Sequence, residues 1–141
     1  MNSLYETILE SNNSKQKIFV VVKPCFLNLS DIIINIFEEN GWCIEKTVVK
    51  KLLLKEARVM YAMHKKEEFY KPLCDYMSSD ICRAFIFTKP GTQSQKTFKE
   101  VAKIKDGIRE KYGESDMRNV LHSSDSEENM YKEASLFFGV I

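Results

Sequence analysis

The sequence predicts one α/β domain of the α+β type, in which helices cover a mainly antiparallel four-stranded sheet with the ferredoxin-like order βαββαβ. Two observations support this prediction. The chain has 141 residues, which is enough for one sizeable hydrophobic core and too few for two ordinary domains. Short β-leaning runs also alternate with segments whose apolar residues recur at helical spacing. This fold supports many functions, so function has to be inferred from the site residues.

A buried strand opens the predicted domain. The run 18–22 is continuous and β-branched, and it ends at Lys23-Pro24, as expected where a strand buried on both faces meets a loop. The isoleucines that follow recur at helical spacing and predict a helix that Asn28 or Ser30 caps and that ends at Asn40-Gly41.

The remaining elements are predicted from β-propensity, helical periodicity and the positions of Pro and Gly. They are a strand at 42–54, two short helices within 55–77 with a break near Glu67 and Pro72, a strand at 84–87, a basic helix at 95–105, a fourth extended segment within 115–121, and a closing helix at 126–138. Ser126 is the expected cap of the closing helix, whose acidic first turn suits the positive end of the helix dipole.

Residues 1–16 are expected to form a leader outside the core, because a polar Ser/Asn cluster there offers little to bury. The domain then covers 17–141. A hydrophobic fraction of 44% and a formal charge of +1 are those of a soluble globular protein without a global field. We therefore expect no nucleic-acid partner and no membrane association.

The cysteines are widely separated and form no C-x-x-C pair, which predicts reduced core thiols and a cytoplasmic location. They are Cys25, Cys43, Cys74 and Cys82.

His122 is the most informative candidate for chemistry. It stands where an extended segment meets the closing helix, among small hydroxyl residues. Such a junction offers free backbone N–H groups and a favourable dipole to an anion, and an imidazole there can act as nucleophile or base. A structural, hydrogen-bonded histidine suits the same position, so the residues alone leave both interpretations open. No glycine-rich phosphate loop and no zinc-protease motif occurs in the chain.

The segment 118–126, RNVLHSSDS, resembles the Arg-Asn-x-x-His-Gly-Ser-Asp-Ser signature of the nucleoside diphosphate kinase family. The run 127–138 is similar to the family's closing helix. Further resemblances occur upstream in the same order: Val22-Lys23-Pro24, Tyr61 to His64 with Phe69-Tyr70, and Gly107-Ile108-Arg109. The resemblance covers about residues 17–138.

The resemblance implies a kinase that passes the terminal phosphate of a nucleoside triphosphate to a diphosphate through phosphorylated His122, with Mg²⁺ arriving on the nucleotide. Glu133 would hold the ring nitrogen opposite the attacking one, and Ser124 would lie beside the histidine. Lys23 and Arg109 would neutralise phosphates. The remaining implied nucleotide contacts are Tyr61 at the phosphates, Phe69 on the base, Asn119 on the sugar, and Lys99 near the position of a family arginine.

The sequence also departs from the family pattern. It is short between Phe87 and Gly107, and Ser123 replaces the signature glycine. Glu110 and Asp116 add negative charge near a polyphosphate site. These departures favour the divergent branch of the family, and the alternative function is a nucleotide-binding or scaffold module with weak or no activity. Because the short loop and the early C-terminal end remove parts that build family hexamers, we expect a dimer or a monomer.

Overall fold

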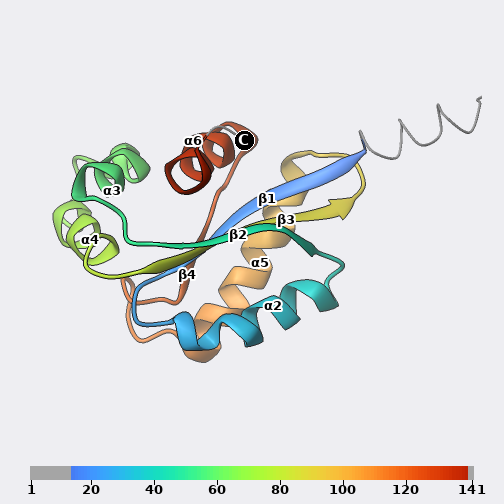
Figure 1. Ribbon diagram of the computed structural model, residues 1–141, viewed down its shortest axis with the longest axis horizontal. Helices are drawn as coiled ribbons and strands as arrows, with labels where there is room; N and C mark the ends of the chain where they lie inside the picture. Colours follow the sequence, from blue (N-terminus) through green and yellow to red (C-terminus); the bar gives the residue numbers. More distant parts are fainter. Residues whose placement is uncertain (1–13, 140–141) are drawn as a thin grey trace, which may run out of the picture.

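The computed structural model describes residues 14–139, which form a four-stranded sheet with helices on both faces (Figure 1). The strand order is β2-β3-β1-β4, and each neighbouring pair is antiparallel. The predicted fold class is therefore confirmed. The strands are β1 (Lys15–Val22), β2 (Cys43–Lys50), β3 (Cys82–Pro90) and β4 (Leu121–Ser123).

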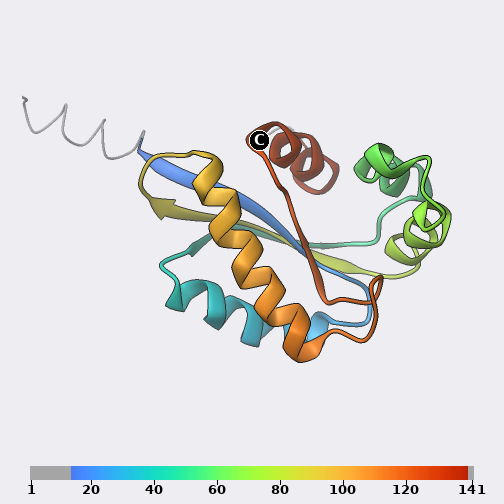
Figure 2. The ribbon, with the colours of Figure 1, turned by 180° about the vertical axis from the view of Figure 1, so that it is seen from behind.

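The helices divide between the two faces of the sheet. Figures 1 and 2 show α2 and α5 on one face and α6 on the other, with α3 and α4 grouped beside α6 at one end of the sheet. The α-helices are α2 (Ser30–Glu39), α3 (Leu54–Met60), α4 (Tyr70–Met77), α5 (Gln95–Tyr112) and α6 (Glu127–Phe138). Two 3-10 turns are η1 (Leu27–Leu29) and η2 (Ala62–His64). Within residues 14–139, no helix combines the length and apolar character needed to cross a membrane.

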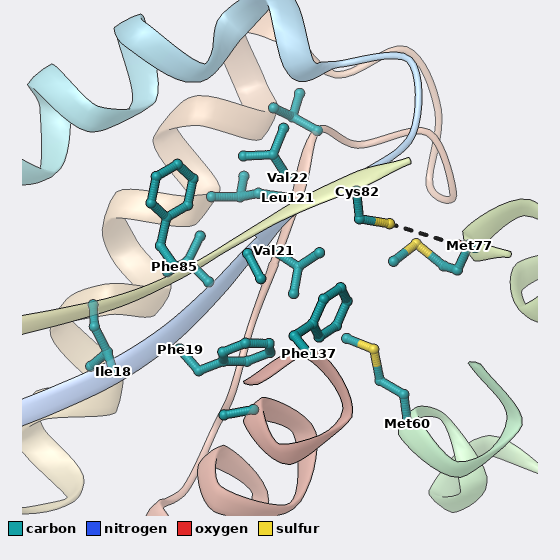
Figure 3. Packing of buried hydrophobic residues seen from close by; sticks show 14 of the residues in the cluster. Ile18, Phe19, Val21, Val22, Met60, Met77, Cys82, Phe85, Leu121 and Phe137 are labelled. Atoms are coloured by element: carbon teal, nitrogen blue, oxygen red, sulfur yellow. Dashed lines mark hydrogen bonds between the residues drawn. The ribbon is translucent and has the colours of Figure 1, made fainter. Parts of the chain in front are cut away.

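Strand β1 is the centre of the core because helices cover both of its faces. Residues 18–22 are all buried, which explains why the run is continuously apolar instead of alternating. Figure 3 shows Phe19 and Val21 directed toward Phe137 of α6, while Ile18 and Val22 point to the opposite face. The ring centroids of Phe19 and Phe137 lie 5.6 Å apart.

The pairing of β4 with β1 positions the site. His122 on β4 lies opposite Val21, and the Lys23 N–H donates to the Val120 carbonyl at 2.8 Å. The nucleophile candidate and the lysine that follows β1 therefore reach the same end of the sheet. Helix α6 begins where predicted, since the Ser126 hydroxyl accepts a hydrogen bond from the Asn129 N–H.

Several boundaries differ from the prediction. Strand β1 begins at Lys15, so Lys15 and Gln16 already pair with β3, although the leader was expected to extend through residue 16. The rest of that segment, residues 1–13, lies outside the described residues. Neither Asn28 nor Ser30 caps α2, because η1 precedes it and the Ser30 hydroxyl donates to the Leu27 carbonyl at 2.6 Å. Strand β2 ends at Lys50, short of the expected limit.

Helix α5 continues to Tyr112 and does not end near Lys105 as predicted. Gly107 lies inside this helix with open space where a side chain would stand, so packing does not require a glycine there, and the helix ends at Gly113. The fourth strand starts at Leu121, at the end of the segment predicted to hold it.

The prediction of four core thiols is half wrong. Cys74 and Cys82 are buried, whereas Cys25 and Cys43 are exposed. Cys43 is exposed because β2 is an edge strand in which no residue is buried, and Cys25 lies in the loop after β1. All four are free thiols.

Candidate active site

A cleft of about 450 Å³ opens at the end of the sheet where β1 ends and β4 begins. Six of the nine site residues predicted from the sequence line it, from five separate stretches of the chain. The complete lining is Lys23, Tyr61, His64, Phe69, Leu73, Arg109, Asp116, Met117, Asn119 and His122.

A smaller cavity of about 200 Å³, here named the side cavity, shares Tyr61, His64 and His122 with the cleft. His122 therefore borders two hollows. The other residues that line the side cavity are Met60, Met63, Lys105, Ser123, Asp125 and Glu133.

The imidazole of His122 is held by a carboxylate. Its Nε2 is hydrogen-bonded to Oε1 of Glu133, a side chain that is only 3% exposed. An ionised Glu133 accepts a hydrogen bond and cannot donate one, so Nε2 carries the ring proton. The lone pair of the neutral ring then lies on Nδ1, which makes Nδ1 the nucleophilic nitrogen. The family resemblance implied this pairing of Glu133 with the imidazole.

Tyr61 packs edge-on against His122, with 5.6 Å between the ring centroids and 78° between the ring planes. Its buried hydroxyl has no hydrogen-bond partner among residues 14–139. Burial, followed by the negative charge of Glu133, raises the pKa of Tyr61, so the hydroxyl keeps its proton. The hydroxyl is a hydrogen-bond donor beside the nucleophile that has no acceptor within the described part of the protein. Leaving a buried hydroxyl unpaired costs folding free energy, so a ligand atom that accepts this hydrogen bond would be stabilised here.

Lys23 is a buried cation with little local compensation. It is 4% exposed, and its Nζ donates to the Met117 carbonyl at 3.2 Å. Burial, followed by the positive charges of Arg109 and Lys105, lowers the pKa of Lys23 from 10.5 to about 7. A bound polyanion would raise the pKa of Lys23 again, because it would supply the missing negative charge.

Arg109 is fixed by β4. Its Nη2 donates to the Leu121 carbonyl at 2.8 Å, while its buried Nε finds no partner in the described part of the chain. Asn119 is held similarly, since its Nδ2 donates to the Asp116 carbonyl at 2.8 Å, and its buried Oδ1 lacks a partner within residues 14–139. Both side chains are oriented by the protein yet retain polar atoms for a ligand.

The backbone between these groups is strained. Val120 has a φ of 80°, which is rare for a β-branched residue. The Leu121 N–H donates to the Asn119 carbonyl at 3.0 Å, and this two-residue spacing defines a γ-turn. The turn lets Asn119 and His122 line the same cleft, and strain of this kind costs on the order of 1–3 kcal/mol.

Phe69 is an aromatic platform at the mouth of the cleft. It is 46% exposed and packs on His64, with the ring centroids 5.2 Å apart. An exposed ring over a half-buried neighbour can stack on a flat heterocycle without reading its edges.

Ser124 and Lys99 line neither hollow, although both were predicted site residues. Ser124 is buried, its N–H donates to the Phe19 carbonyl, and its hydroxyl has no partner in residues 14–139. Lys99 is exposed on α5, six residues before Lys105. We correct the predicted site accordingly and leave Lys99 out of it.

Two residues that line the side cavity were not predicted as site residues. His64 was expected only to continue the family pattern, yet it follows Tyr61 by three residues and borders both hollows. Lys105 precedes Arg109 by four residues, which places both on one face of α5. The four-residue spacing could have identified Lys105 from the sequence, but only if the helix had been predicted to extend as far as Arg109.

A third hollow of about 520 Å³, named here the acidic hollow, adjoins the cleft and shares Arg109, Asp116 and Asn119 with it. Asp116 and Glu110 were both predicted to add negative charge near the site. Asp116 lines the cleft as well as the acidic hollow, whereas Glu110 lines the acidic hollow but not the cleft. The remaining residues around the acidic hollow are Asp106, Gly113, Glu114 and Ser115.

The ferredoxin-like sheet, the carboxylate-held imidazole and the buried or half-buried cations around it are those of a phosphotransferase domain. The family model described as nucleoside diphosphate kinase matches residues 16–140. The chain belongs to the nucleoside diphosphate kinase family.

Sequences of known relatives align with this chain along nearly their full length. The nucleoside diphosphate kinase of Lawsonia intracellularis is 30% identical over 132 residues, covering 87% of this chain and 94% of the relative. That of Chlorobium chlorochromatii is 33% identical over 134 residues, covering 87% and 93%. The predicted family and kinase function are confirmed by these relatives.

Solved structures confirm the fold. The nucleoside diphosphate kinase of Encephalitozoon cuniculi superposes with a TM-score of 0.77 at 23% identity, covering 88% of this chain and 89% of that one. The Aquifex aeolicus enzyme gives a TM-score of 0.72 at 22% identity, covering 86% and 94%.

Proposed function

We propose that the chain transfers the terminal phosphate of a nucleoside triphosphate to a nucleoside diphosphate through a phosphohistidine at His122. The observation that carries this proposal is the pairing of His122 Nε2 with buried Glu133, beside a cleft lined by Lys23 and Arg109. Phosphoryl transfer needs positioning and charge neutralisation more than covalent work by the protein, and these residues supply both.

The first half-reaction phosphorylates the enzyme. His122 Nδ1 attacks the terminal phosphorus, a nitrogen–phosphorus bond forms, and the bond to the bridging oxygen breaks. The electron pair of that bond leaves with the diphosphate product. Glu133 stabilises the positive charge that develops on the imidazole because it stays hydrogen-bonded to Nε2–H.

The second half-reaction returns the phosphoryl group to an acceptor. A terminal oxygen of the nucleoside diphosphate attacks phosphorus, the nitrogen–phosphorus bond breaks, and its electron pair returns to Nδ1. The enzyme is restored with the same proton on Nε2. One site thus serves donor and acceptor in turn, which requires that it accept different bases.

The other residues bind the nucleotide. Lys23 and Arg109 neutralise phosphate oxygens, and the Tyr61 hydroxyl donates to one of them. Asn119 binds a sugar hydroxyl, and Phe69 stacks on the base. Ser124 and Lys99 have no part in this scheme.

Mg²⁺ fits the site as a partner of the phosphates. Among residues 14–139 no three His, Cys, Asp or Glu side chains converge as a metal site, and the cleft presents mainly cations to a ligand. Phosphate oxygens would therefore hold the ion, as is usual for Mg²⁺ at nucleotide sites. The bound ion would neutralise charge on the phosphates.

We also propose a cytoplasmic protein that works as a dimer or a monomer. Four free cysteines support a reducing compartment. Helix α5 runs unbroken through Gly107 to Arg109, so the family loop that resemblance places in this region is replaced by helix. That replacement supports an assembly smaller than a hexamer.

The second candidate function is a nucleotide-binding or scaffold module with little kinase activity. It is favoured by Asp116, whose carboxylate lines the cleft and repels a polyphosphate. Nucleotide binding without formation of phosphohistidine would be its signature.

The test is incubation with ATP labelled in the terminal phosphate. We expect an acid-labile, alkali-stable phosphoprotein that passes its label to GDP, and no label on the His122→Ala variant. Circular dichroism and thermal unfolding of the variant check that the fold is retained. Label that survives in His122→Ala contradicts the proposal, and an unlabelled wild-type protein that binds ATP selects the second candidate.

A further inference from the structure

Lys105 stands at the site without any assigned partner. It is half-buried and lines the side cavity together with His122 and Glu133. Within residues 14–139 its ammonium group makes no ion pair. A half-buried cation of this kind loses hydration and gains no ion pair from the protein, which is costly unless a ligand supplies an anion in direct contact.

The carboxylates around Lys105 are engaged elsewhere. Glu133 is hydrogen-bonded to His122, and Asp125 accepts a hydrogen bond from Asn129 Nδ2 at 2.7 Å. The negative charges of Asp106, Asp125 and Glu133 partly offset the effect of burial on the pKa of Lys105, but none of the three forms an ion pair with it. The charge on Lys105 is therefore available to a ligand.

Lys105 also belongs to one group of cations. Burial, followed by the positive charge of Arg109, lowers the pKa of Lys105, and Lys105 in turn contributes to the lowered pKa of Lys23. Three positive side chains lie close enough to repel one another, on both hollows that border His122. A multiply charged anion at His122 would relieve all three repulsions at once.

We propose that Lys105 is a third phosphate-binding cation and contacts the terminal phosphate of the bound nucleotide at His122. This inference rests on the proposed function, since it takes the ligand to be a nucleoside triphosphate. From the side cavity, Lys105 meets the terminal phosphate while Lys23 and Arg109 act from the cleft. Lys105 thus supplies charge at the phosphorus that is transferred, where negative charge shifts during the reaction.

The test compares two lysines of the same helix. Lys105→Met removes the charge and keeps an unbranched apolar stem, while Lys99→Met makes the same change at an exposed position that lines neither hollow. Calorimetry measures binding of AMP and of a β,γ-imido analogue of ATP, which has a terminal phosphate that is not transferred. Labelling of His122 by ATP is timed in parallel, and thermal unfolding checks each variant.

We expect Lys105→Met to weaken binding of the imido analogue by about 10- to 100-fold and to change AMP binding less than about twofold. Labelling should slow by a similar factor. Lys105→Arg should recover most of the affinity, and Lys99→Met should match the wild-type protein. Equal affinities of Lys105→Met and Lys99→Met for the imido analogue overturn the inference.

The two proposals fail separately. If wild-type protein is never labelled at His122, the phosphohistidine mechanism is wrong, yet the binding comparison still tests Lys105. If labelling occurs and only its rate changes in Lys105→Met, with binding of the analogue unchanged, Lys105 does not contact the terminal phosphate of the bound nucleotide, and the inference is overturned.

Discussion

The cleft and the acidic hollow meet at Arg109, yet they have opposite electrostatic character. Lys23 and Arg109 line the cleft together with His122. The acidic hollow is lined by four carboxylates, on Asp106, Glu110, Glu114 and Asp116. The cations lie buried or half-buried, whereas these four acidic residues are exposed. The positive charges therefore lie deeper in the protein than the negative charges.

This difference teaches that short-range contacts, more than a long-range field, select the ligand. Exposed carboxylates are screened within about 10 Å at ordinary ionic strength, while buried cations interact strongly with whatever reaches them. The formal charge of +1 gives little steering over long distances. Discrimination should therefore depend on the cleft, with the acidic hollow acting as a modest, salt-dependent penalty.

The largest effect on activity is expected from removing the guanidinium of Arg109, which lines both the cleft and the acidic hollow. Arg109→Ala should lower the rate of His122 labelling about 10²- to 10³-fold, because it removes a charged donor to the transferring phosphate. Lys103→Ala, an exposed site on the same helix, is the matched control. A labelling rate within a few-fold of wild type in Arg109→Ala would place the phosphates outside the cleft.

The second effect separates binding from stability. Lys23→Met should weaken ATP binding about 100-fold, and the ligand-free variant should be more stable at pH 7 by about 1–3 kcal/mol because a costly buried charge is gone. Chemical unfolding with and without ATP measures both. Loss of stability in the variant at pH 7 would show that the lysine stabilises the empty protein.

The sign of the pH dependence follows from the same lysine. Its pKa is about 7 when folded and 10.5 ordinarily, so between these values the unfolded chain binds more protons than the folded one. The contribution of Lys23 to folding stability therefore rises as pH increases from about 7 to 10.5. Below pH 7 the lysine is protonated in both states, so the full cost of burying its charge lowers the stability of the folded protein. Unfolding curves at pH 7 and 9 should show a smaller rise in Lys23→Met than in wild type.

The smallest effect concerns the boundary between the hollows. Asp116→Asn should tighten ATP binding about threefold to tenfold at low salt, and the gain should shrink at high salt. Glu110→Gln, which removes a charge from the acidic hollow alone, should change affinity less than about twofold. Titrations at two salt concentrations measure both variants. Equal gains from the two substitutions would mean that overall charge, and not position, determines affinity.

Local sequence signals predicted much of the fold, and the family resemblance implied the centre of the site. The strand at 18–22, the Ser126 cap and the closing helix depend on neighbouring residues alone, so composition and periodicity were enough. The pairing of His122 with Glu133 followed from the family resemblance, and the geometry agrees with it.

The remainder depended on tertiary structure. Lys105 was overlooked because the predicted end of α5 came too early, and only the longer helix places it on the face of Arg109. Lys99 had the right chemistry on the wrong face. Cys43 looked buried in an apolar segment, but strand order puts β2 at the sheet edge. Propensity does not report which strand lies at an edge.

The ladder between β1 and β4 has one more consequence. His122 and the backbone of Lys23 are anchored through the same few hydrogen bonds, and β4 is an edge strand of three residues. Short edge elements fray at lower free energy than the core. Detachment of this single strand would separate His122 from Lys23 while the core remains folded, so heating should inactivate the protein at a lower temperature than the one at which it unfolds. A nucleotide that contacts both strands should hold them together and reduce the difference between these two temperatures.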